Sequence, residues 1–316
     1  MRSVVLHLFV MGLAAGLAAG CASQEDAKGP PTAAAEPAAV EVKPPPPAPE
    51  KAAAPARPKS PTDCGPPIDG LDALLEKPGL LLIGELHGTR EIPATIGRIV
   101  CAASARRPVR LGVELSRAEQ ARIDRFMASG GEAAARDDLT DGQPWRWTFQ
   151  DGRTSVALVD LLERIRALRA AGRDVAAFGY DVVRFDGATT RDKGMADFVI
   201  TARKALPEAT FIVVSGNRHT QIRSEPGPPG EPAFVPMGAH LAAAFEDVVA
   251  LDARTNGGEF WACIGPDPTS CGPQKRAFKP STRDGIYIDR QTRPLPPGHH
   301  GVLHVGRATV SPPARK

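Results

Sequence analysis

The segment 80–88, with the sequence LLLIGELHG, constrains the fold of this chain more than any other segment. Four consecutive apolar residues followed by Gly84 are typical of a strand that is buried on both faces. Glu85 and His87 come next, and residues two apart in extended backbone point to the same side. A carboxylate and an imidazole at the end of a buried strand are costly without partners. They therefore indicate either a satisfied polar cap of the strand or a functional site.

The rest of the chain alternates between segments that are typical of strands and segments in which apolar residues have helical spacing. The expected strands after the first span 109–114, 175–179, 210–215 and 248–251, with shorter ones at 286–288 and 302–305. The expected helices span 90–105, 116–130, 155–171, 193–206 and 241–245. Such alternation is typical of parallel strands that are covered on both faces. We predict an α/β fold with an open, mostly parallel central sheet and helices on both faces.

The N-terminal residues resemble a bacterial lipoprotein signal peptide. An apolar run over 4–17 is too short for a comfortable membrane span, and residues 17–21 (LAAGC) are similar to a lipobox. Residues 1–21 are therefore expected to direct export, with Cys21 as the lipidated residue. The lipid would make the membrane a partner, and Ala22 after the cysteine implies an outer-membrane lipoprotein of the bacterial cell envelope.

Two regions of different composition follow the signal peptide. Residues 22–62 are rich in Ala and Pro and have almost no aromatic or branched apolar side chains, so they cannot bury enough surface to offset the entropy of ordering. We expect a disordered tether there and one α/β domain over 63–313. The formal net charge is +3, and Lys and Arg are scattered without a basic block, which argues against a nucleic-acid partner.

The predicted domain contains four cysteines, an even number in a chain that is expected to reach an oxidising compartment. Cys263 and Cys271 bracket a Gly/Pro-rich loop and form the first expected disulfide. Cys64 and Cys101 form the second, which would join the start of the domain to its first helix. A four-cysteine zinc site is the alternative, but no Cys-x-x-Cys spacing supports it.

Polar residues follow each of the five main expected strands. They are Glu85 and His87, Glu114, Tyr180 and Asp181, Asn217 to His219, and Asp252. Because parallel strands end at one edge of a sheet, where ligands bind in such folds, these residues are expected to lie near one another. Two histidines and several carboxylates there could bind a divalent metal or perform acid–base catalysis.

Some of these residues also have a purely structural interpretation. His87 and His219 could be hydrogen-bonded strand caps. Glu114 could serve the helix N-terminus that the Ser116 capping box opens. The placement of these side chains in the folded chain decides between the two interpretations.

Other polar residues have structural interpretations in turns or as solvated side chains. Asp181 and Asp252 suit turn positions, whereas Arg153 and Arg191 are candidate anion clamps for which a solvated arginine is the alternative.

The sequence lacks several familiar catalytic and binding motifs. They include the Gly-x-Ser-x-Gly elbow of serine hydrolases, the His-Glu-x-x-His zinc helix, the Walker loop and the Cys-x-x-Cys-His haem motif. An ordinary serine hydrolase is therefore disfavoured.

The remaining motifs resemble those of a known superfamily. Residues 84–87 (GELH) and 216–219 (GNRH) are similar to the paired Gly-x-x-His motifs of the superfamily that joins erythromycin esterases, Tiki metalloproteases, TraB proteins and ChaN haem-binding lipoproteins. The resemblance extends through 112–114 (GVE) and 151–153 (DGR) and covers most of 80–252. These motifs are short, so they indicate the superfamily and not one activity within it.

The resemblance implies catalytic roles for five residues. Glu85 and His87 would activate water, directly or through a metal. Glu114 and His219 would complete the ligand or acid–base set, and Arg153 would position an anionic or carbonyl oxygen. Glu85, His87 and His219 are the implied ligands of a divalent metal such as Mn²⁺, Co²⁺ or Zn²⁺.

Two functions follow as hypotheses. The first is a lipid-anchored hydrolase that cleaves an ester, amide or peptide bond in a small-molecule or peptide substrate. The second is a ChaN-like lipoprotein that binds haem or another small ligand without turnover. Against haem, Tyr180 and Tyr287 are the only tyrosines, and neither is close to a histidine motif. The segments 137–149 and 222–236 are the candidates to cover the site.

Overall fold

The structure is a computed structural model that describes residues 60–182, 190–275, 283–291 and 296–315, all within the compact unit 51–316. Its main sheet contains β1 (Leu80–Glu85), β2 (Val109–Ser116), β3 (Val175–Asp181), β4 (Thr210–Gly216), β5 (Val248–Arg254), β8 (Tyr287–Asp289) and β9 (Gly301–His304). The helices are α1 (Glu91–Ser104), α2 (Gln120–Ala128), α3 (Ala133–Leu139), α4 (Val156–Ala170), α5 (Arg191–Ala205) and α6 (Met237–Ala244).

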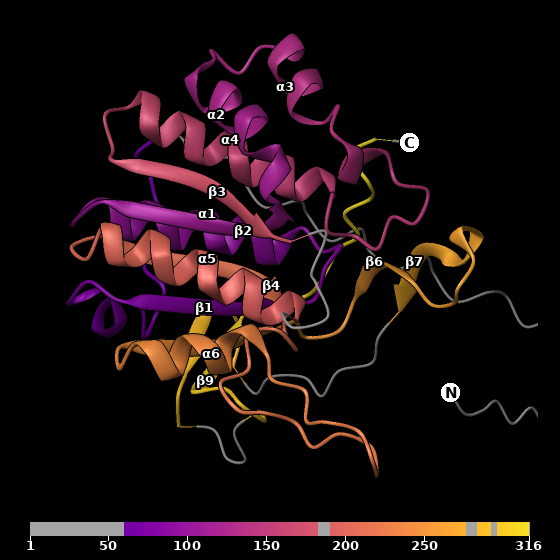
Figure 1. Cartoon of the computed structure of the whole chain (residues 1–316). Coiled ribbons are helices and arrows are strands. Elements are labelled where there is room, and N and C mark those ends of the chain that lie inside the picture. Colours follow the sequence, from indigo (N-terminus) through magenta and orange to yellow (C-terminus); the bar gives the residue numbers. More distant parts are fainter. Residues whose placement is uncertain (1–59, 183–189, 276–282, 292–295, 316) are drawn as a thin grey trace, which may run out of the picture. The chain divides into compact units, whose positions relative to one another are not determined.

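The order of the strands in the main sheet is β3-β2-β4-β1-β5-β9-β8 (Figure 1). All neighbouring pairs are parallel except β8 and β9, which are antiparallel. This confirms the predicted α/β fold with a mostly parallel sheet, and the short expected strands near residues 286 and 302 do extend its edge. The strand β1 lies between β4 and β5, so the segment that opened the sequence analysis occupies the interior of the sheet.

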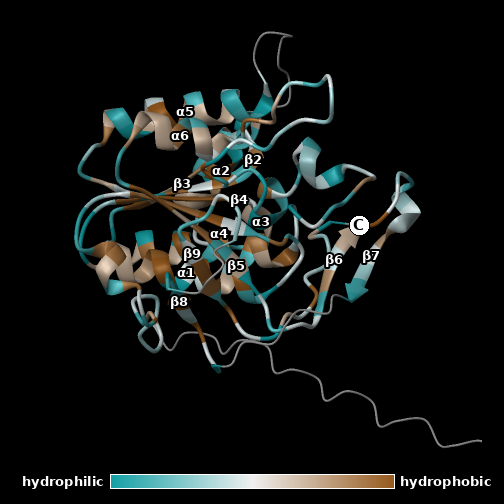
Figure 2. Cartoon of the chain, turned by 90° about the horizontal axis from the view of Figure 1, so that it is seen from below, coloured by the Kyte–Doolittle hydropathy of each residue, from teal (hydrophilic) through white to brown (hydrophobic). Residues whose placement is uncertain are grey.

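Helices cover both faces of the sheet, with α1 and α4 on one side and α5 and α6 on the other (Figure 2). The side chains of β1 divide between the two faces with the period of two that a strand requires. Leu81 and Ile83 belong to the core cluster that contains the apolar residues of α1 and α4. Leu80 and Leu82 belong to the cluster of α5 and α6. The unbroken apolar run of β1 is therefore explained by burial on both faces.

The register of the strands brings three of the expected polar ends to one level of the sheet edge. Glu85 of β1 is opposite Gly216 of β4. Val113 of β2 is opposite Val214 of β4, and the pairing of β2 with β3 then shifts between Val113 and Ser116. The residue that follows Val113 therefore lies beside the end of β4, next to the end of β1.

Two helices begin earlier than their sequence pattern predicts. The expected helix at 193–206 begins at Arg191, where Thr190 accepts a hydrogen bond from the Lys193 amide as the N-cap. The expected helix at 241–245 begins at Met237, whose amide donates to the buried Asp192 carboxylate at 2.8 Å. The cap of α6 is thus supplied by a residue of another helix, which a local sequence pattern does not reveal.

Both predicted disulfides are present, Cys64–Cys101 and Cys263–Cys271. The first joins the start of the domain to α1. The second closes an antiparallel hairpin of β6 (Glu259–Cys263) and β7 (Cys271–Lys275), two strands that the sequence pattern did not predict on either side of the expected loop. The Trp261 amide of this hairpin donates to the Gly88 carbonyl at 2.9 Å, so the hairpin lies against the turn that follows β1.

The predicted signal peptide at 1–21, its Cys21 lipidation site and the tether up to residue 59 lie outside the described residues. The last tether residues are described, and Arg164 of α4 donates to the carbonyls of Pro61 and Asp63. Within the described ranges, no helix is both long enough and apolar enough to serve as a membrane span.

Candidate active site

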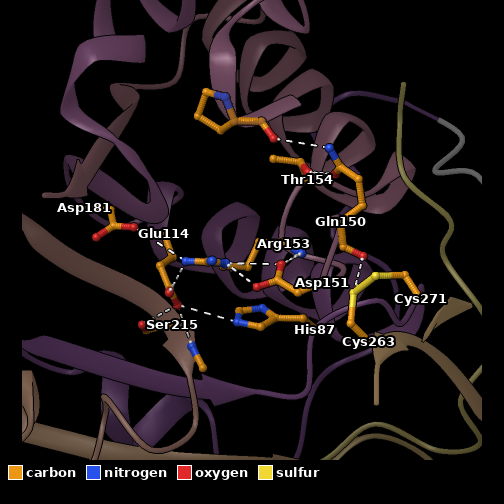
Figure 3. A network of polar contacts seen from close by, with 12 residues as sticks. His87, Glu114, Gln150, Asp151, Arg153, Thr154, Asp181, Ser215, Cys263 and Cys271 are labelled. Carbon is orange, nitrogen blue, oxygen red and sulfur yellow. Dashed lines mark hydrogen bonds and ion pairs between the residues drawn. A yellow bond between two sulfur atoms is a disulfide. The ribbon is translucent and has the colours of Figure 1, made fainter. Parts of the chain in front are cut away.

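Glu114 is the centre of the polar cluster at the carboxyl edge of the sheet (Figure 3). Its Oε2 accepts hydrogen bonds from the Ser215 hydroxyl at 2.6 Å and from the Gly216 amide at 2.8 Å. Its Oε1 accepts from Arg191 Nη2 at 2.6 Å and from Arg153 Nη1 at 3.1 Å. All these partners come from β4, α5 and the loop before α4. The Glu114 carboxylate therefore binds groups at the edge of the sheet and does not cap the helix N-terminus at Ser116.

Glu114 is ionised despite its burial, with only 5% of its side chain exposed. Burial raises the pKa of this carboxyl group, but the nearby charges of His87, Arg153 and Arg191 oppose that effect and hold the pKa well below its ordinary value. The result is a fixed negative charge beneath the site. Because both carboxylate oxygens are saturated with donors, Glu114 is placed to stabilise charge and is not free to accept a proton.

His87 has a carboxylate near each ring nitrogen, but only Nδ1 is within hydrogen-bond distance of one. Its Nδ1 lies 2.8 Å from Glu85 Oε1, and its Nε2 lies 3.6 Å from Glu114 Oε2. Burial lowers the pKa of His87, but the hydrogen bond from Glu85 and the charges of Glu85, Glu114 and Asp151 outweigh it, so the pKa is raised above 6.5. Glu85 fixes the proton on Nδ1 in the neutral ring, which leaves the Nε2 lone pair facing the site.

His219 has a different environment from His87. Its Nδ1 lies 2.7 Å from Asp192 Oδ1, and its Nε2 lies 3.0 Å from Arg191 Nη1. An arginine can only donate, so His219 Nε2 accepts and its Nδ1–H donates to Asp192. This arrangement assigns His219 to the neutral form, with both nitrogens engaged by the first turn of α5.

Gly216 separates the two histidines. A Cβ atom at this position would lie 3.2 Å from His87 Nε2 and 3.7 Å from His219 Cδ2. The same atom would lie 3.9 Å from Glu114 Oε2. Because Gly216 has no side chain, none lies between its Cα and the two imidazoles, and we call this position the gap over Gly216.

Two arginines form the cationic wall of the site. Arg191 donates to both carboxylate oxygens of Asp181 at 2.8 Å, in addition to its bonds to Glu114 and His219. Arg153 Nε donates to Asp151 at 2.9 Å, and the Asp151 carboxylate also accepts from the Arg153 amide. Within the described residues, Arg153 Nη2 makes no hydrogen bond, so it can donate to a ligand oxygen.

The predicted metal ligands do not fit a metal ion in this arrangement. Among the residues that the structure describes, no three His, Cys, Asp or Glu side chains are grouped as metal ligands would be. Glu85 is bonded to His87, and His219 Nε2 accepts from Arg191. The guanidinium groups of Arg191 and Arg153 already neutralise Glu114, and a divalent cation beside them would be repelled. We therefore derive no chemical step through a metal.

The structure brings together all five predicted catalytic residues, which are Glu85, His87, Glu114, Arg153 and His219. It adds the candidate clamp Arg191, which is largely buried and paired with carboxylates, together with Asp181, which was expected to be only a turn residue. Asp252 stays outside this cluster and pairs with Arg254 at 2.8 Å.

Sequence reasoning missed Asp192 and Ser215. Both are buried, and both accept or donate a hydrogen bond to a predicted site residue. Ser215 directly precedes the GNRH motif, so its position at the end of an apolar strand was an available signal. Asp192 offered no such signal, because an acidic residue in the first turn of a helix is ordinarily explained by the helix dipole.

Two adjoining pockets open at this cluster, and both are lined by Glu114 and Arg153. One extends along β1 and α4, with Glu85, Gly88 and Gly152 in its wall. The other extends under the predicted covering segment and is lined also by Gln143, Pro144, Trp147, Phe149, Asp151 and Asp181. Part of the segment 137–149 therefore does border the site, as its position in the sequence indicated.

Solved structures with the same architecture include a mutant of the erythromycin esterase EreC in its open conformation, with a TM-score of 0.55 and 13% sequence identity over 76% of this chain and 93% of that one. The chain has the erythromycin esterase-like fold. A protein described as a succinoglycan biosynthesis protein matches with a TM-score of 0.54 and 9% identity over 76% of this chain and 91% of that one. A Bacillus cereus protein matches with a TM-score of 0.50 and 12% identity over 83% and 96%.

Comparison of the sequence with protein-family models and with curated proteins finds no match. The identities to the solved structures are low enough that they establish the erythromycin esterase-like fold alone. Any proposal for the reaction of this chain therefore depends on the geometry of its own site.

Proposed function

We propose that this protein is a hydrolase that cleaves an ester or amide bond with His87 as general base. The observation that carries the proposal is the His87 ring, whose Nδ1 is held at 2.8 Å by Glu85 while Nε2 faces the gap over Gly216. An erythromycin esterase, by its name an ester-cleaving enzyme, shares the fold. A carboxylate–histidine pair with a guanidinium beside it is the equipment that water attack on a carbonyl requires.

The proposed hydrolysis begins with the attack of a water molecule on the carbonyl group. His87 Nε2 removes a proton from a water molecule in the gap over Gly216, and the water oxygen bonds to the carbonyl carbon. The carbonyl oxygen becomes an oxyanion that accepts a hydrogen bond from Arg153 Nη2. The bond to the leaving oxygen or nitrogen then breaks, and His87 returns its proton to that atom. The fixed charge of Glu114 stabilises the imidazolium while it carries the proton.

The test uses the purified full chain in detergent with a panel of carboxylic esters, amides and peptides, each assayed with and without chelator. We expect hydrolysis of at least one ester class, with a rate that His87→Ala lowers about a thousandfold. A haem titration of the same preparation tests the binding alternative. A Soret shift that His87→Ala removes, together with no turnover of any panel member, would replace the hydrolase with a binding protein.

Gly216→Ala is expected to lower kcat/KM at least tenfold, because the added Cβ would lie 3.2 Å from His87 Nε2 and take the space of the attacking water. The matched control is Gly272→Ala on β7, where a Cβ would meet no atom within 4 Å. Both variants are measured by steady-state kinetics and thermal melting. A Gly216→Ala protein with unchanged kcat/KM would show that the gap is not where water attacks.

Anchoring at the envelope is part of the proposal and depends on the apolar run 4–17, the lipobox-like residues 17–21 and Ala22. We infer that Cys21 carries a lipid and that the domain is held at the bacterial outer membrane. Intact-mass analysis of the protein from membranes, compared with Cys21→Ser, checks this. The inference would be contradicted if the Cys21→Ser protein carried the same added lipid mass and stayed in the same membrane fraction as the wild type.

A further inference from the structure

Large apolar side chains are exposed at four positions in the part of the chain that the structure describes, namely Trp147, Phe149, Val235 and Ile264. Two of these four line one pocket together with Glu114 and Arg153 of the active site. Trp147 is 43% exposed and Phe149 is 39% exposed, whereas the neighbouring Trp145 is 1% exposed. Two of the four exposed large apolar side chains in the described residues therefore lie together beside the reactive groups, as is usual for a ligand-binding surface.

The backbone beneath the two aromatic residues is held in place, so their exposure is not that of a loose loop. The Gln150 side-chain Nε2 donates to the backbone carbonyls of Trp145 at 3.1 Å and Trp147 at 2.7 Å. Its side-chain oxygen accepts from the Thr154 hydroxyl at 2.5 Å (Figure 3). The Gln150 backbone carbonyl accepts from Trp261 Nε1 at 2.8 Å.

The same contacts connect the aromatic residues with the catalytic groups. Gln150 directly precedes the Asp151-Gly152-Arg153 turn, and the Cys263–Cys271 disulfide lies beside its carbonyl (Figure 3). A group bound on Trp147 and Phe149 would therefore be positioned relative to Arg153 by a fixed segment. Such positioning is how a binding surface contributes to the rate of the reaction beside it.

The charges of the pocket select among the groups that it could hold. Asp151 and Asp181 line it with Glu114, and Arg153 is the cation in its wall. Arg153 is already paired with Asp151 and Glu114. An anionic group would meet these carboxylates at short range and be disfavoured. An uncharged ring or alkyl group would avoid this repulsion and could pack against the exposed apolar surfaces of Trp147 and Phe149.

We propose that Trp147 and Phe149 form a subsite for an uncharged aromatic group of the substrate, attached next to the bond that is cleaved. The inference deepens the proposed hydrolase and rests on it, since it names the substrate class of the same site. The chain is thus an esterase or amidase for compounds with an apolar ring near the carbonyl, and small polar esters are poor substrates.

Two esters of one acid test the subsite in the full-length protein. Benzyl acetate carries the ring next to the scissile bond, and ethyl acetate lacks it. We expect the wild type to hydrolyse benzyl acetate with a kcat/KM at least tenfold above that for ethyl acetate. Trp147→Ala and Phe149→Ala should each reduce that ratio by about threefold or more, and Trp147→Phe should restore most of it. Ile264→Ala, which removes a side chain that is 75% exposed outside both pockets, should leave the ratio unchanged.

A binding measurement separates this inference from the proposed function. Benzylacetone is the analogue of benzyl acetate with a methylene group in place of the ester oxygen, so it binds without being cleaved. Saturation-transfer NMR should show contact between its ring and the wild-type protein, lost in the Trp147→Ala, Phe149→Ala double variant and kept in Ile264→Ala. Binding without hydrolysis of any ester would keep the subsite and reject the hydrolase. Hydrolysis with equal kcat/KM for both esters in wild type and variants would reject the subsite.

Discussion

His87→Ala is expected to lower kcat for ester hydrolysis about a thousandfold, which is the range of a general base. The neutral His87 ring is the active form, and its pKa is raised above 6.5 by Glu85 and Glu114. The rate should therefore rise with pH along a limb that lies above pH 6.5 and reach a plateau once His87 is deprotonated. Steady-state kinetics over the pH range from about 5 to 9 measures both quantities.

Glu85→Gln provides a sharper test of the same residue. The amide keeps the size of the carboxylate but removes the charge that raises the pKa of His87. The limb of the pH profile should then move to lower pH, and kcat at the plateau should fall because the imidazolium has lost a stabilising partner. His240→Ala on α6 is the matched control and should leave the profile in place. A limb that stays at the same pH in Glu85→Gln, or a His87→Ala protein within tenfold of wild type, would exclude His87 as the base.

Glu114→Gln is expected to lower the free energy of unfolding by about 3–5 kcal/mol, the cost of removing one partner from a buried charge network. Each Glu114 oxygen accepts two donors, so the amide nitrogen would face two N–H or O–H groups in either orientation. Arg153 and Arg191 would keep their pairs with Asp151 and Asp181 but lose the carboxylate that they share. For a domain of this size the change corresponds to a melting temperature lower by about 10 °C.

The pH dependence of unfolding reports on the same carboxylate. Because the pKa of Glu114 is lower in the folded protein than its ordinary value of about 4.5, the unfolded chain binds more protons in acid. The stabilisation by Glu114 is therefore complete above about pH 4.5 and is lost progressively as the pH falls below that value. Denaturant titrations of wild type and Glu114→Gln should converge in acid. Glu259→Gln, at a half-buried position on β6 away from the cluster, should match the wild type throughout, and equal stability of all three at neutral pH would contradict the central role of Glu114.

The polar ends of the strands could be predicted because they depend on local rules. The alternation of side chains in an extended segment places Glu85 and His87 on one side wherever β1 lies. The common edge of a parallel sheet then brings His219 and Glu114 near them, which is why all five predicted residues are in the cluster. The disulfides followed in the same way from the number and placement of the cysteines in a chain expected to be exported.

The order of the strands could not be predicted, and it decides the chemistry of the site. β4 lies between β2 and β1, so Ser215 and Gly216 reach Glu114, and the carboxylate is held as a fixed charge. A local sequence pattern does not predict which strands are neighbours, because the strand order depends on how the helices pack on both faces of the sheet. The same packing places the first turn of α5 against His219, which assigns Arg191 and Asp192 to the site.

The sequence by itself therefore determined which side chains this protein presents at the edge of its sheet, since side-chain direction along a strand and the shared edge of parallel strands are local geometry. Only the tertiary structure decided what state those side chains are in. The neutral His219 and the permanently charged Glu114 depend on donors from distant segments, whereas the His87 tautomer is set locally by Glu85, two residues away. Hydrogen bonds between elements far apart in the chain set protonation, and a sequence pattern carries no record of them.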